Sequence, residues 1–190
     1  MMNRIICLIV LSLSVWAWQS VAVAKEGYQG YQLVIKRSEN KLLVKKDGLV
    51  MTSFHIAYGS GKGAKRWAGD RRTPVGEYKI IELRDSDKFH LFFQLNYPSV
   101  RDAMQGLREK RISQSEYRRI VDAHLAHRLP PQNTALGGSI GIHGIGIETE
   151  DKIDIHEVAN WTKGCIALRN KEVDLLARIV GPGTPVIIEE

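Results

Sequence analysis

Cysteine is scarce in this chain, which has two cysteines, Cys7 and Cys165, among its 190 residues. Long apolar runs are also missing beyond residue 24, so no later segment resembles a membrane-spanning helix. Repeats, linkers and low-complexity tracts are absent as well, and what remains is one domain's worth of sequence. Aromatic residues make up 7% of the chain and are not interleaved with the basic ones, which argues against stacking platforms for nucleic acid.

The N-terminal segment has the pattern of an export signal. A basic start and the apolar run Ile5–Trp18 lead to the small-residue site Ala22–Ala24. We expect a cleaved signal peptide over residues 1–24 and a single domain over 25–190. An uncleaved anchor helix is the alternative, although the apolar run is short for a full span. Once the signal is removed, Cys165 has no intramolecular disulfide partner.

The charge balance is mildly basic. The formal net charge is +6 for the full chain, and it becomes +5 without Arg4, with 26 basic and 21 acidic side chains. Export argues against nucleic acid as a partner, and an anionic polymer of the cell envelope is a simpler explanation of the positive charge. A basic surface with no specific ligand is equally compatible with this surplus.

The pattern of alternation predicts a mainly β fold. Three strands joined as a meander, with a tight hairpin at Asp47-Gly48, are expected over Tyr31–Lys36, Lys41–Lys46 and Leu49–Ala57. Further strands are expected at Glu77–Leu83, Leu91–Tyr97 and Val186–Glu189, and a C-terminal helix over Lys171–Val180. The stretch Gly59–Gly63 lacks the spacing of a phosphate-binding loop, so we expect a flexible loop there.

A helical insertion interrupts the strands at about residues 99–131. Apolar residues recur there at helical spacing, and Ser113–Glu116 has the capping-box pattern, so two short helices are predicted. His124 and His127 lie beside Asp122 at a spacing that metal ligands use, but a pair alone is a weak signal. We expect a surface helix and no metal site.

Cys165 is the first candidate for chemistry. It follows Gly164 and the polar pair Thr162-Lys163, and a predicted helix begins soon after it. A thiol near a helix N-terminus and near cations has a lowered pKa and is more reactive, so we expect a nucleophile. The alternative is a buried structural cysteine, which is common.

His143 is the candidate base for that nucleophile. It lies in a stretch, Ser139–Ile147, in which glycine alternates with isoleucine, and glycine allows a substrate to approach a strand closely. The backbone amides of Gly164 and Cys165 could form an oxyanion hole. Together these groups fit acyl transfer through a thioester. A second histidine, His156, is expected on the polar face of a short helix or turn over Asp154–Asn160.

At these residues the chain resembles the L,D-transpeptidase catalytic domain family, also called YkuD. The resemblance covers nearly all of residues 25–190, and its motifs are Arg72-Thr73-Pro74-x-Gly76-x-Tyr78, Asn96-Tyr97-Pro98, Ile142-His143-Gly144 and Thr162-x-Gly164-Cys165-Ile166. It implies a mixed-strand β sandwich or barrel-like fold with the helical insertion and the C-terminal helix. It also implies that the thiol attacks the peptide bond after the third residue of a peptidoglycan stem tetrapeptide and releases D-alanine. An amine of a second stem would then resolve the thioester, with no cofactor and no metal.

The same resemblance assigns roles to neighbours of the two candidates. The carbonyl of Gly144 would orient His143, Thr162 would line the site, and the Gly164 and Cys165 amides would hold the oxyanion. The chain departs from the family pattern at Lys163, where many members have His, and at Ala167, where many have Arg. The missing guanidinium could be supplied by Arg169 or by Arg71 and Arg72. Lys163 would favour the thiolate if it points inward.

Three functions remain compatible with the sequence. The first is an L,D-transpeptidase in the periplasm of a Gram-negative-type envelope, which joins stem peptides or attaches an envelope protein to peptidoglycan. The second is a hydrolase on the same scaffold, either an L,D-carboxypeptidase or an enzyme that releases a peptidoglycan-bound protein. The third is a non-catalytic wall-binding module with an inert Cys165. We expect no nucleic acid partner and no stable membrane span after signal cleavage.

Overall fold

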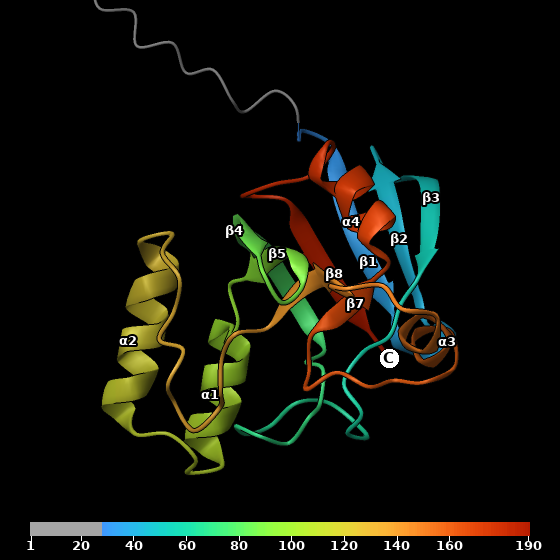
Figure 1. Cartoon of the computed structure of the whole chain (residues 1–190). Helices are drawn as coiled ribbons and strands as arrows, with labels where there is room; N and C mark the ends of the chain where they lie inside the picture. Colours follow the sequence, from blue (N-terminus) through green and yellow to red (C-terminus); the bar gives the residue numbers. More distant parts are fainter. Residues whose placement is uncertain (1–27) are drawn as a thin grey trace, which may run out of the picture.

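The strands of the chain form an eight-stranded mixed sheet in the computed structural model, which describes residues 28–190 (Figure 1). The signal peptide predicted over 1–24 lies outside the described residues. The strand bounds are β1 Tyr31–Lys36, β2 Lys41–Lys46, β3 Leu49–His55, β4 Gly76–Ser86, β5 His90–Leu95, β6 Gly141–Gly144, β7 Ile166–Leu168 and β8 Pro185–Glu189. The α-helices are α1 Val100–Arg108, α2 Gln114–Leu125, α3 Glu150–Val158 and α4 Asn170–Ala177. None of these helices is long and apolar enough to cross a membrane.

The N-terminal meander is confirmed. Strands β1, β2 and β3 pair antiparallel in succession, and Asp47 and Gly48 both have positive φ, 51° and 83°. Positive φ at both central residues is what a two-residue type I′ hairpin requires. The local turn chemistry therefore sets the register of this hairpin.

The sheet curls until its two edges meet. The strand order is β3-β2-β1-β8-β4-β5-β6-β7, so β3 and β7 are the edge strands. Directly after β3, Ala57 pairs antiparallel with Ala167 of β7, through N–H to carbonyl distances of 3.1 Å and 2.7 Å. Strands β1 and β8 pair in parallel, as do β6 and β7, and the other pairs are antiparallel. The expected mixed-strand, barrel-like β fold is confirmed.

The main core fills the inside of this curved sheet. Leu33, Phe93, Ile142 and Ile166 project into it from four strands, and each is fully buried. Helix α4 adds Val173 and Leu176 to the same cluster. Because side chains alternate along a strand, the residues next to Ile142 and Ile166 point to the opposite face. That opposite face carries the candidate site.

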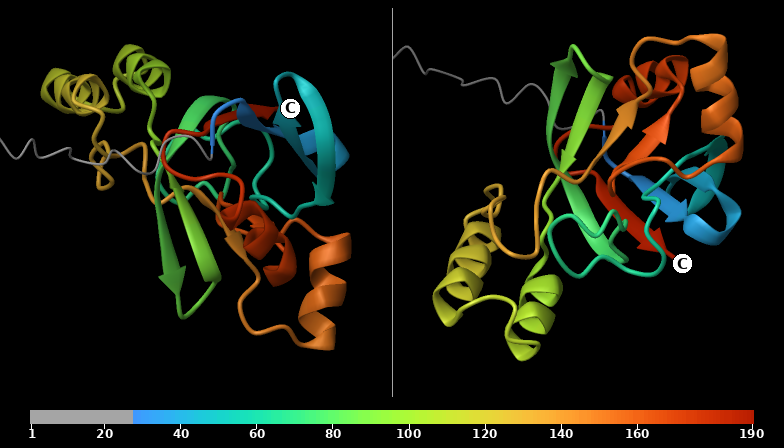
Figure 2. Two further views of the ribbon diagram at one scale, coloured as in Figure 1. Left: turned by 90° about the horizontal axis from the view of Figure 1, so that it is seen from above. Right: turned by 60° about the horizontal axis from the view of Figure 1, so that its bottom comes forward.

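The helical insertion is also confirmed, and Figures 1 and 2 show α1 and α2 standing together at one side of the sheet. Ser99 and Ser113 begin the two helices with capping boxes, the second of which was predicted. The pair has a small core of its own, made of Ala103, Ile112, Ile120 and Leu136. His124 is partly buried, and its Nε2 lies 2.8 Å from the carbonyl of Pro98.

The segment between β3 and β4 is a loop, as expected for residues 59–63, but it is tethered at several points. The guanidinium of Arg37 donates to the carbonyls of Gly63 and Thr73, at 3.0 Å and 3.2 Å. The Thr73 hydroxyl accepts from the N–H of Gly59 at 2.9 Å. These bonds hold the two ends of the loop together beside the sheet.

The middle of the loop contains a buried ion pair between Lys65 and Asp70. Their side chains are 3% and 1% exposed, and Nζ lies 2.9 Å from Oδ1. Asp70 also accepts from the N–H groups of Arg66, Trp67 and Arg72. Burial alone would raise the pKa of Asp70, but the four hydrogen bonds that its carboxylate accepts together outweigh burial, and the pKa is lowered. The carboxylate is therefore charged and organises the loop around itself.

We predict that Asp70→Asn lowers the free energy of unfolding by about 3–5 kcal/mol, because it leaves the buried ammonium of Lys65 without its counter-charge. Urea unfolding followed by circular dichroism should show a lower midpoint at an unchanged slope. Asp122→Asn removes an exposed carboxylate from α2 and should change stability by less than about 0.5 kcal/mol. An equal loss in both variants would contradict this assignment.

Candidate active site

The parallel pairing of β6 with β7 brings the two candidate catalytic residues to one face of the sheet. In its register His143 lies opposite Ala167, and Ile142 lies opposite Ile166. In-register residues of a parallel pair point to the same side, and side chains alternate along each strand. Cys165, one residue before β7, therefore shares the face of Ala167 and His143, away from the main core.

The thiol lies close to the chain that leads into β6. Cys165 is partly exposed, and its Sγ lies 3.2 Å from the carbonyl of Ser139, to which it can donate. Burial by the surrounding protein raises the pKa of Cys165 to about 11, against smaller opposite effects from the Gly141 N–H and from Lys65. The expected lowering of this pKa is wrong, because burial outweighs both effects that lower it. Strand β7 also separates Cys165 from the N-terminus of α4.

The nearby cation also differs from the one expected. Lys163, which could have favoured the thiolate, is exposed. The cation that lowers the pKa of Cys165 is instead Lys65, whose side chain is buried next to Gly137 in the approach to β6. Lys65 could not be identified as a neighbour from the sequence, because one hundred residues separate it from Cys165.

His143 is 2% exposed and is held in one orientation. Its Nδ1 lies 2.7 Å from the Gly144 carbonyl, which can only accept, so Nδ1 carries the proton and Nε2 is the free basic nitrogen. The rings of Phe89, Phe92 and Trp161 lie 4.1 Å, 5.8 Å and 6.3 Å from the imidazole. Burial among them lowers the pKa of His143 to about 4, although the bond to Gly144 acts in the opposite direction.

The residue that accepts this bond has no room for a side chain. A Cβ on Gly144 would lie 2.5 Å from Oδ1 of Asn170 and 2.7 Å from the carbonyl of Phe89. Asn170 in turn exchanges hydrogen bonds with the backbone of Gly146. The carbonyl that orients His143 is therefore fixed from both sides.

Thr162 shapes the turn that carries the thiol. Its buried hydroxyl donates to the Cys165 carbonyl at 2.6 Å and accepts from the Gly164 N–H at 3.1 Å. Gly164 has φ of 128°, and a Cβ there would lie 2.7 Å from the carbonyl of Arg72, so glycine is needed. Of the two amides expected in an oxyanion hole, that of Gly164 is thus already engaged by Thr162.

The candidate arginines differ in their availability. Arg169 is paired with Glu148 at 3.2 Å and lies 3.8 Å from Glu157, so its charge is offset within the protein. Arg72 has no carboxylate partner among residues 28–190, and its guanidinium carbon lies 5.0 Å from the centre of the Trp67 ring. Arg71 is exposed. The part of Arg72 that lies against Gly164 of the thiol turn is its backbone carbonyl.

His156 was expected on a polar face, and this expectation is wrong. It is fully buried, its ring lies 5.6 Å from that of His55, and neither of its ring nitrogens has a hydrogen-bond partner among the described residues. Burial lowers its pKa to about 4. Helix α3 has almost no apolar periodicity in its sequence, so the buried side of that helix could not be found from spacing.

Two neighbours of the site, Phe89 and Lys65, were not identified from the sequence, and Ser139 was included only as the start of the glycine–isoleucine stretch. They reach it through pairings between distant segments, β5 with β6 and the loop after β3 with the chain before β6. Only Asp70, in a Gly-Asp turn, carries a local signal of an organised loop.

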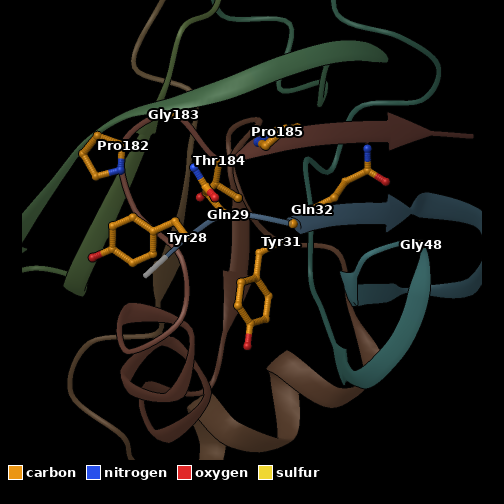
Figure 3. Close-up of a pocket in the computed structure, with 10 residues that line it drawn as sticks. Tyr28, Gln29, Tyr31, Gln32, Gly48, Pro182, Gly183, Thr184 and Pro185 are labelled. Atoms are coloured by element: carbon orange, nitrogen blue, oxygen red, sulfur yellow. The ribbon is translucent and has the colours of Figure 1, made fainter. Parts of the chain in front are cut away.

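One well-formed cavity of about 430 Å³ lies elsewhere (Figure 3). Tyr28, Tyr31 and Gly183 are among its lining residues, and none of the predicted site residues is. A larger cavity of about 510 Å³, lined by Lys79, Asn96 and His124 among others, also contains none of the predicted site residues, so cavity size does not identify the reactive centre among the described residues. Among residues 28–190, no three His, Cys, Asp or Glu side chains are grouped as a metal site.

Solved structures with the same fold include three that are similar over most of this chain. The helical cell shape determining protein Pgp2 from Campylobacter jejuni has 22% identity and a TM-score of 0.56, over 84% of this chain and 47% of that one. Bd1075 from Bdellovibrio bacteriovorus has 20% identity and a TM-score of 0.53, over 87% and 49%. An L,D-transpeptidase from Mycobacterium smegmatis has 13% identity and a TM-score of 0.51, over 85% and 59%. At these identities the likeness shows the fold.

The chain spans about half the length of the first two of these structures. A comparison with curated proteins gives no match. The family model of the L,D-transpeptidase catalytic domain, YkuD, matches residues 30–188, which is most of the chain. With its mixed sheet and the thiol and imidazole on one face, the chain belongs to the YkuD family of L,D-transpeptidase catalytic domains.

Proposed function

We propose that the protein is a cysteine L,D-transpeptidase that acts on peptidoglycan stem peptides through a thioester. The observation that carries the proposal is the shared face of Cys165 and His143, together with the 2.7 Å bond that leaves Nε2 of His143 free to accept a proton. Membership of the family supports peptidoglycan as the substrate.

The first half-reaction forms the acyl-enzyme. Nε2 of His143 takes the thiol proton as Sγ of Cys165 attacks the carbonyl carbon after the third residue of the stem. The tetrahedral intermediate collapses when the C–N bond breaks, and His143 returns the proton to the leaving amine of D-alanine. The stem tripeptide remains bound to Sγ as a thioester.

The second half-reaction transfers the acyl group to an amine. The amine of a second stem, or of an envelope protein, attacks the thioester carbon and gives its proton to His143. Sγ then leaves as the C–S bond breaks and is reprotonated. One amide bond is broken in the first half-reaction and one is formed in the second, so no external source of energy is needed.

Both catalytic groups are proposed to be neutral at rest. A thiol with a pKa of about 11 and an imidazole with a pKa of about 4 do not exchange a proton spontaneously at neutral pH. The proton therefore moves only as the new C–S bond forms. The thiol of Cys165 therefore reacts only with a substrate that is already bound beside it.

The oxyanion is proposed to be stabilised mainly by the N–H of Cys165. Thr162 engages the N–H of Gly164, and through its bond to the Cys165 carbonyl it also fixes the peptide plane after the thiol. A preorganised donor is more effective than a mobile one, because no reorientation is required during the reaction. Thr162 thus acts as a positioning residue.

The proposed location is the periplasm. The substrate of the proposed reaction lies outside the cytoplasmic membrane, and the pattern of residues 1–24 is that of an export signal. The proposed single domain over 25–190 would then carry the whole activity of this chain.

Intact-mass spectrometry with purified disaccharide tetrapeptide tests the function. We predict an adduct with loss of D-alanine on the wild type, followed by a cross-linked dimer, and no adduct on Cys165→Ala. His143→Gln should form the adduct about 10²–10⁴-fold more slowly, because it lacks the base. His127→Gln changes an exposed histidine after α2 and serves as the matched control.

An adduct on Cys165→Ala, or none on the wild type, would overturn the proposal. An adduct that decays only to a free tripeptide would show instead that water is the acceptor, as in a hydrolase.

The pH dependence of alkylation tests the neutral resting state. A pKa of about 11 means less thiolate at any lower pH, so iodoacetamide should label Cys165 about 100-fold more slowly at pH 7 than a model thiol of pKa 9.0. The rate should keep rising towards pH 11, and His143→Gln should leave the profile unchanged. A fast plateau below pH 8 that His143→Gln abolishes would indicate a thiolate–imidazolium pair.

A pair of variants tests the role of Thr162. Thr162→Val leaves the Gly164 N–H and the Cys165 carbonyl without their partner, so we predict a loss of about 1–3 kcal/mol in stability and slower acyl-enzyme formation. Thr162→Ser keeps the hydroxyl and should retain both properties. Equal behaviour of the two variants would count against the hydrogen bonds and in favour of packing alone.

A further inference from the structure

The resting thiol of Cys165 is bonded to a backbone carbonyl. Its Sγ lies 3.2 Å from the carbonyl oxygen of Ser139, and among residues 28–190 it forms no hydrogen bond with Nε2 of His143. A carbonyl oxygen can only accept, so this bond requires the protonated thiol. The Ser139 carbonyl therefore stabilises the thiol before reaction, and the S–H group has to turn away from it before His143 can take the proton.

Ser139 has a backbone conformation that needs support from its neighbours. It lies two residues before β6, its side chain is exposed, and its φ is 53°. Residues other than glycine rarely adopt this left-handed conformation, and they keep it only where the surrounding structure holds it. The direction of the Ser139 carbonyl therefore depends on what holds the peptide groups on either side of it.

Gln132 holds the peptide group before this carbonyl. Its Oε1 accepts from the N–H of Ser139 at 2.6 Å. Its Nε2 donates to the carbonyls of Tyr97 and Pro130, at 2.8 Å and 2.7 Å. A Cβ on Gly138 would lie 2.5 Å from the Gln132 carbonyl, so glycine allows the two segments to approach this closely. The amide of Gln132 is thus bonded at both ends and ties Ser139 to the chain that follows β5.

The peptide group after the carbonyl is held by two donors. The carbonyl of Ile140 accepts from the N–H of Leu95 and from Nε2 of Gln94, both at 3.0 Å. Loss of the Gln94 side chain would therefore leave the bond from the backbone of β5 in place. The N–H of Ser139 is bonded to Gln132 instead. The orientation of the Ser139 carbonyl therefore depends on Gln132 more than on Gln94.

We propose that Gln132 is a positioning residue for the nucleophile, which sets through the Ser139 backbone where Cys165 keeps its proton before reaction. This inference rests on the proposed function, since it takes Cys165 as the nucleophile. Gln132 follows α2 and Pro130–Pro131, where the chain runs back from the helical insertion towards β6 (Figure 1). The insertion thus contributes to the reactive centre through one side-chain amide.

Raman spectroscopy of the S–H stretch tests the proposal, because this vibration falls in frequency when the thiol donates a hydrogen bond. The band that is missing from Cys165→Ala identifies Cys165 in the wild-type spectrum. Gln132→Met is similar in size and lacks the amide, so we predict that the band broadens and moves to higher frequency. Gln94→Met removes the matched amide beside Ile140 and should leave the band in place. An unshifted band in folded Gln132→Met, or an equal shift in Gln94→Met, would overturn the proposal.

The pH profile of alkylation provides a second readout. Loss of the acceptor removes stabilisation from the protonated thiol only, so the pKa of Cys165 should fall in Gln132→Met. We predict that iodoacetamide labels this variant about 2- to 10-fold faster at pH 7 and that its profile shifts to lower pH. Ser139→Gly keeps both backbone groups and adopts positive φ readily, so it should match the wild type. A rate raised by the same factor at every pH would indicate greater exposure alone and would contradict the proposed role.

Amide hydrogen exchange of the wild type tests the same contact without any variant. The N–H of Ser139 should exchange about 10- to 100-fold more slowly than that of Asn133, which is exposed in the same loop and has no hydrogen-bond partner among the described residues. Equal exchange at the two amides would overturn the role of Gln132, even if Gln132→Met does not fold. Acyl-enzyme formation on the wild type is scored separately, so the function can stand while the positioning role fails.

Discussion

The parallel pairing of β6 with β7 is the interaction on which the site depends. Its register directs Ile142 and Ile166 into the core and thereby turns His143 and the residue before β7 to the other face. A shift of one residue would reverse both faces. The pairing of Ala57 with Ala167 holds the outer side of β7, so a strand of three residues is fixed on both edges. Short strands at a sheet edge are otherwise weakly held.

Burial raises the pKa of the Cys165 thiol and lowers the pKa of the His143 imidazole, so that both groups are neutral. The aromatic rings around His143 and the turn around Cys165 remove water, which disfavours the charged form of each group. Charge is kept instead in the loop beside them, where Lys65 and Asp70 neutralise each other with full hydrogen bonding. The site thus has an apolar interior, and the charged groups beside it form a neutral ion pair.

Features with local signals could be predicted from the sequence. The Asp47-Gly48 hairpin and the capping box at Ser113 both depend on residues close together in the chain. The bond between His143 and the Gly144 carbonyl was expected only from the family resemblance. The pKa of Cys165 could not be predicted, because it depends on packing by segments that are distant in sequence. The burial of His156 was missed for the same reason, since α3 has no clear apolar stripe. Spacing suggested the reactive groups, but their protonation states depend on the assembled fold.

The closure of the sheet also bears on the order in which the domain can form. Strand β1 pairs with β8, and Ala57 pairs with Ala167, so the meander near the start depends on segments more than one hundred residues later. Contacts between distant segments require closing large loops, which slows folding. Strand β8 lies between β1 and β4, so the N-terminal meander and the strands that position the thiol become one continuous sheet only when residues 185–189 join them.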